Sequence, residues 1–271
     1  MDRPGSKILR LAKTLEEHRE YLEKIVGLKL HFMHRWLAAH PNEGFIEVLR
    51  NRVDIYRKTD ANPGPAVPVS IDWSAPAWRV LEEGLADRYL SSGTDAERFE
   101  ASGLAFLKDT LDARTPRDFA DPSLLSPYDC GSLRHEPKQE TPGVVGFHIA
   151  NALSPGSPFD DPAYLPACFV VLINQVESRL GGHTLTTDTW LNEVPRWLSL
   201  FPREWGDNLS ERKTDVAWHY GYWGQFITAR GTFDEAAGRY LRTQGHMRYY
   251  PRSSWAPLEV FKRHFRKVLT K

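Results

Sequence analysis

Residues 144–151 read VVGFHIAN, in which apolar side chains alternate with small or polar ones. A period of two predicts a β-strand with Val145, Phe147 and Ile149 on one face. The opposite face carries His148 between two small residues. At this strand the sequence changes from helical patterns to a mixture of helix and strand patterns.

The segments after this strand predict both helices and a further strand. Residues 167–180 form an apolar run that ends at two glycines and has no polar face, so we expect a helix buried at the centre of the fold. The β-branched residues 184–190 predict a second strand. Shorter patterns predict helices over residues 193–201, 233–244 and 255–270.

The N-terminal part of the sequence predicts a layer of helices. Residues 6–40 keep their apolar positions on one face at helical spacing, despite Gly27. Further helices are predicted over residues 42–56, 76–89 and 94–111. Residues 60–65, DANPGP, break the pattern and are the best candidate for a linker. Residues 113–142 contain five prolines and few periodic apolar positions, which predicts a long irregular segment.

Together these patterns predict a predominantly α-helical α+β fold, with an N-terminal helical layer and a mixed C-terminal half that contains a small number of short strands. At about 100–200 residues per domain, the 271 residues fit one large domain or two modest ones. We predict a single domain over residues 1–271. Its subregions are the helical layer 1–112, the irregular segment 113–142 and the aromatic-rich half 143–271.

The composition is that of an ordinary globular protein. Lys and Arg number 35, as do Asp and Glu, and a formal charge of zero argues against a dedicated nucleic-acid-binding protein. Cys130 and Cys168 form no CxxC motif, which favours a reducing compartment. The N-terminus lacks the apolar core of a signal peptide, and the longest apolar run is far shorter than the ~20 residues of a membrane span. We therefore expect a cytoplasmic protein without a membrane partner.

His148 is the first candidate for a catalytic role. Gly146 and Ala150 flank it on the same strand face, and Asn151 lies nearby. Small residues beside a histidine leave room for a ligand against the imidazole. The alternative is a core histidine that bonds to a backbone carbonyl.

Residues 215–226 place five aromatic side chains around His219. As a helix, this segment would set Trp223 one turn after His219, so that the imidazole would lie in an apolar pocket suited to a neutral base or ligand. Gly221 and Gly224 would each cost such a helix about 1 kcal/mol, so either the backbone packs closely or the segment is extended. The alternative is an aromatic core stripe without a catalytic role.

Residues 188–205 mix tryptophan with charged and amide side chains, which is typical of a polar-ligand cleft or a partner interface. An arginine stacked on a tryptophan would supply a fixed cation for a carboxylate, sulfate or phosphate. Asp188, beside threonines and near Trp190, would partner the catalytic histidine or act as a second acid/base group. The alternative for Asn192 is a helix cap, and that for Trp197 is a core position.

Metal and cofactor signatures are weak. His31 and His34 lie three residues apart on the first predicted helix, a spacing at which two histidines can bind one metal ion. No third ligand is evident, so we expect them instead on the solvated face of this helix. The sequence contains no HExxH, GxGxxG, P-loop or GxSxG motif. No recognised motif therefore requires a cofactor, and the cofactor stays unknown.

Residues 239–271 carry nine Lys or Arg and one acid, Glu259, interleaved with aromatic rings. Basic residues beside stackable rings suit single-stranded nucleic acid or an acidic partner protein. The alternatives are an amphipathic helix with a solvated basic side, or arginines such as Arg248 that turn inward beside His246 to bind an anionic substrate group.

From this clustering we expect an intracellular metabolic enzyme that acts on a small polar, anionic substrate by acid/base chemistry in an aromatic, arginine-containing cleft. Transferase, lyase or hydrolase chemistry without redox steps is favoured. The expected catalytic residues are His148, His219 and Asp188. The expected substrate-binding residues are Asn151, Trp190, Asn192, Arg196, Trp223, Gln225, Arg230, His246 and Arg248. The alternatives are a non-catalytic binding protein or partner subunit that uses the basic C-terminal surface, and a His-ligated metal or haem enzyme. Assembly into homo- or hetero-oligomers stays open.

Overall fold

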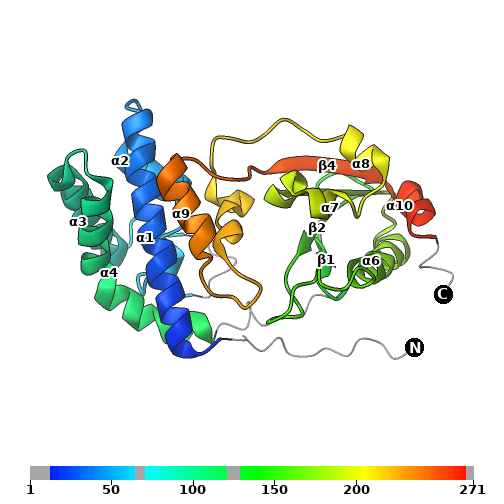
Figure 1. Cartoon of the computed structure of the whole chain (residues 1–271), viewed down its shortest axis with the longest axis horizontal. Helices are drawn as coiled ribbons and strands as arrows, with labels where there is room; N and C mark the ends of the chain where they lie inside the picture. The colour runs from blue at the N-terminus through cyan, green and yellow to red at the C-terminus, as the bar shows by residue number, and fades with distance from the viewer. Residues whose placement is uncertain (1–12, 65–70, 121–128, 267–271) are drawn as a thin grey trace.

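Two groups of elements make up the chain in the computed structural model, which describes residues 13–64, 71–120 and 129–266. Figure 1 shows a helical group at one end of the molecule and a sheet with its covering helices at the other. The buried apolar side chains form one cluster in each group. The predominantly helical α+β fold predicted from the sequence is confirmed.

The helical group is built around α1 (Leu15–Ala39), which packs along α4 (Ala96–Phe119). Thr14 closes the start of α1 with a capping box. Gly27 allows the two helices to approach closely, since a Cβ atom there would lie 2.8 Å from a carboxylate oxygen of Glu100. The other elements of this group include α2 (Phe45–Asn51), η1 (Tyr56–Lys58), α3 (Pro76–Ser92), η3 (Trp218–Tyr220), η4 (Tyr222–Phe226) and α9 (Glu235–Gln244), where η denotes a 3-10 helix.

Helix α1 is buried on more sides than its sequence predicts. Every residue from Ile25 to His34 is buried, because α2, α4 and α9 pack against it from different directions. The solvated face expected for His31 and His34 is therefore wrong, since these side chains lie inside the helical group. Residues 6–12 of the predicted helix lie outside the described residues.

Helix α4 is longer than predicted and continues through Pro116 into the segment expected to be irregular. Its buried Arg114 donates hydrogen bonds to the carbonyl oxygens of Asn62 and Gly64, at 3.0 and 2.9 Å. Residues 60–64 of the expected linker are thus held against α4, because its additional turns carry the arginine that binds them. Residues 65–70 lie outside the described part of the chain.

The second group contains a mixed sheet with the strand order β1-β2-β3-β4. The strands are β1 (Leu133–His135), β2 (Val144–Ile149), β3 (Thr184–Thr189) and β4 (Arg252–Pro257). Strands β2 and β3 are parallel, whereas the two outer pairs are antiparallel. Both predicted strands are confirmed. Strand β1 lies in the segment expected to be irregular, and β4 replaces the start of the last predicted helix, which begins only at Leu258 in α10 (Leu258–His264).

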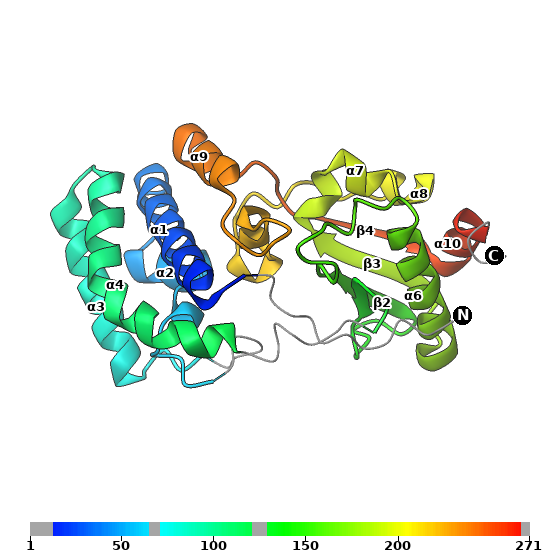
Figure 2. The same cartoon turned by 60° about the horizontal axis from the view of Figure 1, so that its bottom comes forward.

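Helices cover one face of this sheet (Figure 2). Helix α6 (Tyr164–Leu180) packs Phe169 and Leu172 into the sheet cluster, while Asn174 and Glu177 stay exposed. The expectation that this helix is buried on all sides is corrected, since it covers the sheet with one side and meets solvent with the other. The cover is completed by η2 (Trp190–Glu193), α7 (Pro195–Leu198), α8 (Arg203–Asp207) and α10.

The chain passes between the two groups more than once. After the sheet strands β1 to β3, residues 216–247 return to the helical cluster, and β4 then adds the last strand to the sheet. This return places the aromatic segment 215–226 against the N-terminal helices. The single domain expected from the sequence stays a prediction.

Candidate functional site

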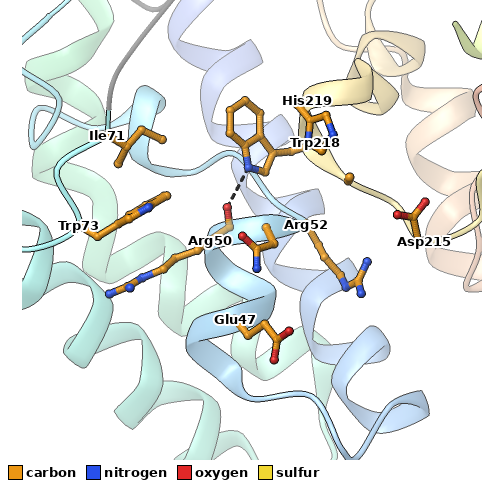
Figure 3. Close-up of a pocket in the computed structure, with 10 residues that line it drawn as sticks. Glu47, Arg50, Arg52, Ile71, Trp73, Asp215, Trp218 and His219 are labelled. Atoms are coloured by element: carbon orange, nitrogen blue, oxygen red, sulfur yellow. Dashed lines mark hydrogen bonds between the residues drawn. The ribbon is translucent and has the colours of Figure 1, made fainter. Parts of the chain in front are cut away.

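A pocket of about 500 Å³ opens where residues 215–219 meet the end of α2, and we call it the α2 pocket (Figure 3). Its lining consists of Glu47, Arg50, Asn51, Arg52, Ile71, Trp73, Asp215, Ala217, Trp218 and His219. Pockets of this volume accommodate small-molecule ligands. The lining joins residues 47–52 and 71–73 with residues 215–219, segments far apart in the sequence that the return of the chain at residue 216 brings together.

Side chains fix the backbone that follows α2 along this pocket. The carbonyl oxygens of three alternate residues accept hydrogen bonds, from Trp218 Nε1 to Arg50 at 2.8 Å, from Trp223 Nε1 to Arg52 at 3.2 Å and from Lys29 Nζ to Asp54 at 2.8 Å. Arg50 lies in the last turn of α2, Arg52 is its C-cap and Asp54 follows it outside any helix or strand, so these donors bind carbonyl groups that the end of the helix leaves without a helical partner. The position of Arg50 and Arg52 is therefore set by the packed tryptophans behind them.

Arginine side chains stack on tryptophan rings around the α2 pocket. The guanidinium carbon lies 5.2 Å from the ring centre for Arg50 on Trp73, 4.4 Å for Arg52 on Trp36 and 4.5 Å for Arg57 on Trp218. The sequence predicted such stacking among residues 188–205, but the described contacts place it here. Stacked guanidinium groups lose side-chain freedom and keep a fixed direction.

Both arginines of the pocket are already paired with carboxylates. Arg50 donates two hydrogen bonds to the buried Glu82, at 2.6 and 2.7 Å, and Arg52 donates two to Glu43, at 2.7 and 3.0 Å. The contact with Glu82 raises the pKa of Arg50 above its ordinary value. These bidentate pairs orient the guanidinium groups and balance their charge.

Lys29 lies behind this wall and is almost fully buried, with 2 % of its surface exposed. Burial lowers its pKa to about 7, although the nearby Asp54 carboxylate opposes the shift. Its Nζ atom also lies 5.4 Å from the ring centre of Trp223. The Lys29 amine therefore contacts the Asp54 carbonyl and the Trp223 ring in the core and is not part of the pocket lining.

Val216, between two residues of the pocket lining, has a strained backbone. Its φ angle is +44°, and no other non-glycine residue in the described ranges has a positive φ angle. A β-branched residue rarely adopts this conformation, which costs of order 1–3 kcal/mol and persists only when the surroundings hold it. Val216 is 1 % exposed, so packing of its side chain holds the turn that directs Asp215 and Ala217 to the pocket.

His219 is the expected catalytic residue that lines this pocket. It lies in η3, and Gly221, with a φ angle of +71°, separates η3 from η4. A glycine in the left-handed region ends the first turn, which explains why the segment forms neither the continuous helix nor the extended strand that we considered. The His219 side chain is exposed, so the enclosed apolar setting predicted for it is wrong.

His148 lies on the uncovered face of the sheet, away from the α2 pocket. Its Nε2 atom pairs with Glu136 Oε1 at 2.9 Å, and both side chains are almost half exposed. A Cβ atom on Gly146 would lie 2.6 Å from the other Glu136 oxygen. The space that the small neighbour leaves is thus filled by the Glu136 carboxylate rather than left for a ligand.

Other expected site residues have structural partners. Asn192 is fully buried, and its side-chain oxygen accepts hydrogen bonds from the indole nitrogens of Trp197 and Trp205, at 3.1 and 3.2 Å. Gln225 is buried and binds the backbone of Tyr249 in both directions. These two amides satisfy buried donors and acceptors of the protein itself.

The remaining expected residues are dispersed over both groups. Two of them form ion pairs, Asp188 with Lys213 and Arg230 with Glu17. Three contact backbone carbonyl groups, namely Arg196 at Phe159, Asn151 at Ala229 and His246 at Met247. Trp190 and Arg248 both lie against the Tyr249 ring, and Trp223 is buried behind the α2 pocket. The structure therefore does not gather the expected residues into one cleft.

Sequence reasoning missed the N-terminal half of the pocket. The sequence analysis assigned Arg50, Arg52 and Trp73 to a helical layer without a role in the site. Trp218, which donates a hydrogen bond to the carbonyl oxygen of Arg50, is 168 residues away from it in the sequence. The local signal was a group of basic residues at and after the end of α2, at positions 50, 52, 57 and 58.

The basic C-terminal residues are largely engaged within the protein. Arg242 pairs with Glu100, Lys262 with Glu177 and Glu259, and Arg263 with Glu204. Within the described ranges no three His, Cys, Asp or Glu side chains lie close enough together to hold a metal ion. Nor does any helix there have the length and apolar character required to cross a bilayer.

Comparisons with protein-family models, with curated proteins and with solved structures find no match to this chain.

Proposed function

We propose that the protein is an enzyme that binds a small polar metabolite in the α2 pocket and acts on it by acid/base chemistry, with His219 as the proton-transfer group. Imidazole titrates close to neutral pH and is the commonest group in this role. The exposed position of His219 at the pocket lining gives it access to a bound ligand.

The observation that carries this proposal is the strained turn at Val216. Proteins retain such backbone strain where a side chain must point in a particular direction, and such sites are often functional. Here the turn precedes Trp218 and His219 and directs Asp215 to the same pocket. Arg50 and Trp73, held by Glu82 and by their own stacking, would position the substrate.

The proposal is tested by a screen of small metabolites for increased thermal stability, followed by incubation of each bound compound with the protein and analysis of products by NMR. We expect at least one compound to bind and to be converted. His219→Asn should retain binding and lose conversion, because asparagine keeps hydrogen bonding but cannot transfer a proton near pH 7.

His246→Asn serves as the matched control, since His246 contacts the Met247 carbonyl away from the pocket. It should leave both binding and conversion unchanged. A compound that binds without conversion by the wild-type protein would assign a binding protein instead of an enzyme. Conversion that survives His219→Asn would remove His219 from the mechanism.

A further inference from the structure

We propose that the α2 pocket selects a ligand that carries an organic cation, such as a primary or substituted ammonium group, held by Glu47 and Asp215 beside the indoles of Trp73 and Trp218. This inference rests on the proposed function, because it names the substrate class of the same pocket. It replaces the anionic substrate that the sequence led us to expect with one that the charges of the lining favour.

The charge balance of the pocket is the first argument. Each arginine of the lining forms a bidentate pair with a carboxylate, Arg50 with Glu82 and Arg52 with Glu43, so each pair is neutral. An anion would have to compete with a carboxylate that is already bound to the same guanidinium group. The two arginines therefore do not form an open anion clamp.

The carboxylates of the lining, in contrast to its arginines, have no charged partner among the described residues. Glu47 and Asp215 are exposed, and neither forms an ion pair with any residue in the described ranges. The lining therefore contributes two uncompensated negative charges beside two neutral pairs. Electrostatic complementarity of this kind favours a cationic ligand and opposes an anionic one.

The aromatic lining is the second argument. Trp73 and Trp218 each have a guanidinium group against the ring, Arg50 at 5.2 Å and Arg57 at 4.5 Å from the ring centre, so both rings attract cations and an ammonium ligand would compete with or replace one of these contacts. Indole rings attract cations through their quadrupole, and aromatic side chains combined with carboxylates recognise ammonium ligands. The same rings give no comparable advantage to a carboxylate or phosphate.

The groups proposed to bind the cation all line the α2 pocket and face it from different sides. Figure 3 shows Trp73 and Ile71 on one side of the pocket, Asp215 on the opposite side, Trp218 and His219 above and Glu47 below. In this view the end of α2, with Arg50 and Arg52, lies between Trp73 and Asp215, so the aromatic wall and the carboxylate belong to the same pocket but lie on different sides of the helix end. The strained turn at Val216 fixes the backbone that carries Asp215.

The test uses three probes that share a phenylethyl group and differ in charge, namely phenethylamine, 2-phenylethanol and 3-phenylpropionate. Their affinities are measured by NMR titration of the full chain at low salt, in the wild-type protein and in the variants Glu47→Gln and Asp215→Asn. Glu140→Gln, an exposed carboxylate in the sheet group, is the matched control.

We expect phenethylamine to bind about tenfold more tightly than 3-phenylpropionate. This ratio of affinities is the size expected from one charge contact together with one cation–ring contact. Each pocket variant should weaken phenethylamine binding about threefold or more and leave 2-phenylethanol binding unchanged, whereas Glu140→Gln should change neither. Tighter binding of 3-phenylpropionate, or equal binding of all three probes in every variant, overturns the cationic selectivity and leaves the pocket as a ligand site. Absence of binding by all three probes at millimolar concentration overturns this inference, whereas the proposed function is tested separately by the metabolite screen.

Discussion

Substitution of Val216 tests the backbone strain directly, because alanine and glycine remove nearly the same side-chain contacts but differ in backbone freedom. Val216 is 1 % exposed and has a φ angle of +44°. Loss of its buried methyl groups should cost either variant about 2 kcal/mol in the free energy of unfolding.

The difference between the two variants isolates the strain. At an ordinary position glycine is less stable than alanine by about 0.5–1 kcal/mol. In the left-handed region a residue with a Cβ atom pays about 1–2 kcal/mol that glycine does not pay. Val216→Gly should therefore be more stable than Val216→Ala by about 1 kcal/mol, which reverses the usual order.

Urea unfolding followed by circular dichroism measures both free energies, with Val145→Ala and Val145→Gly in strand β2 as the control pair. In the control, alanine should be the more stable replacement. If alanine were also the better replacement at position 216 by the usual margin, the turn would carry no strain and the main support for the proposed site would be lost.

Three other predictions concern buried polar groups. The pKa of Lys29 falls to about 7 in the folded protein, below its unfolded value, so the unfolded chain binds more protons than the folded chain between these two pKa values. The free energy of unfolding should therefore rise by about 2 kcal/mol from pH 7 to pH 9 through this group. Urea unfolding should show that this rise is reduced in Lys29→Met but not in Lys108→Met, which changes an exposed lysine. Glu82→Gln leaves Arg50 without its carboxylate and should lower stability by about 2 kcal/mol, whereas Glu83→Gln, an exposed neighbour, should have little effect in the same assay. Asn192→Ala leaves two buried indole donors unpaired and should lower the free energy of unfolding by about 3–4 kcal/mol. If the chain is a single domain, calorimetry of this variant should show one transition at a lower temperature. A separate early transition of the sheet group would contradict the single-domain prediction.

The fold was predictable where a local pattern reports burial. Strand β2 has Val145 and Phe147 in the core at the period of two that its sequence shows. Strand β4 has no such signal, because its inward residues, Ser254 and Ala256, are small and its identity depends on pairing with β3. Pairing between strands that are far apart in the sequence cannot be predicted from the residues of one strand alone.

The candidate site was predictable only in part, for a related reason. The aromatic residues around His219 were visible as a local cluster, and the structure places His219 at a pocket lining. The partners of this cluster, Arg50 and Trp73, come from a distant segment that shows only helical spacing and charge. Likewise, nothing near His148 in the sequence indicated that Glu136 occupies the space over Gly146.

The most direct measurement of the central claim is an NMR spectrum of the indole N–H groups, recorded while phenethylamine or a compound from the metabolite screen is added. The account predicts that the resonances of Trp73 and Trp218, which line the α2 pocket, shift with ligand concentration. Those of Trp197 and Trp205, buried in the sheet cluster, should stay in place. Shifts confined to the sheet cluster, with Trp73 and Trp218 unchanged, would show that the protein binds its ligand elsewhere.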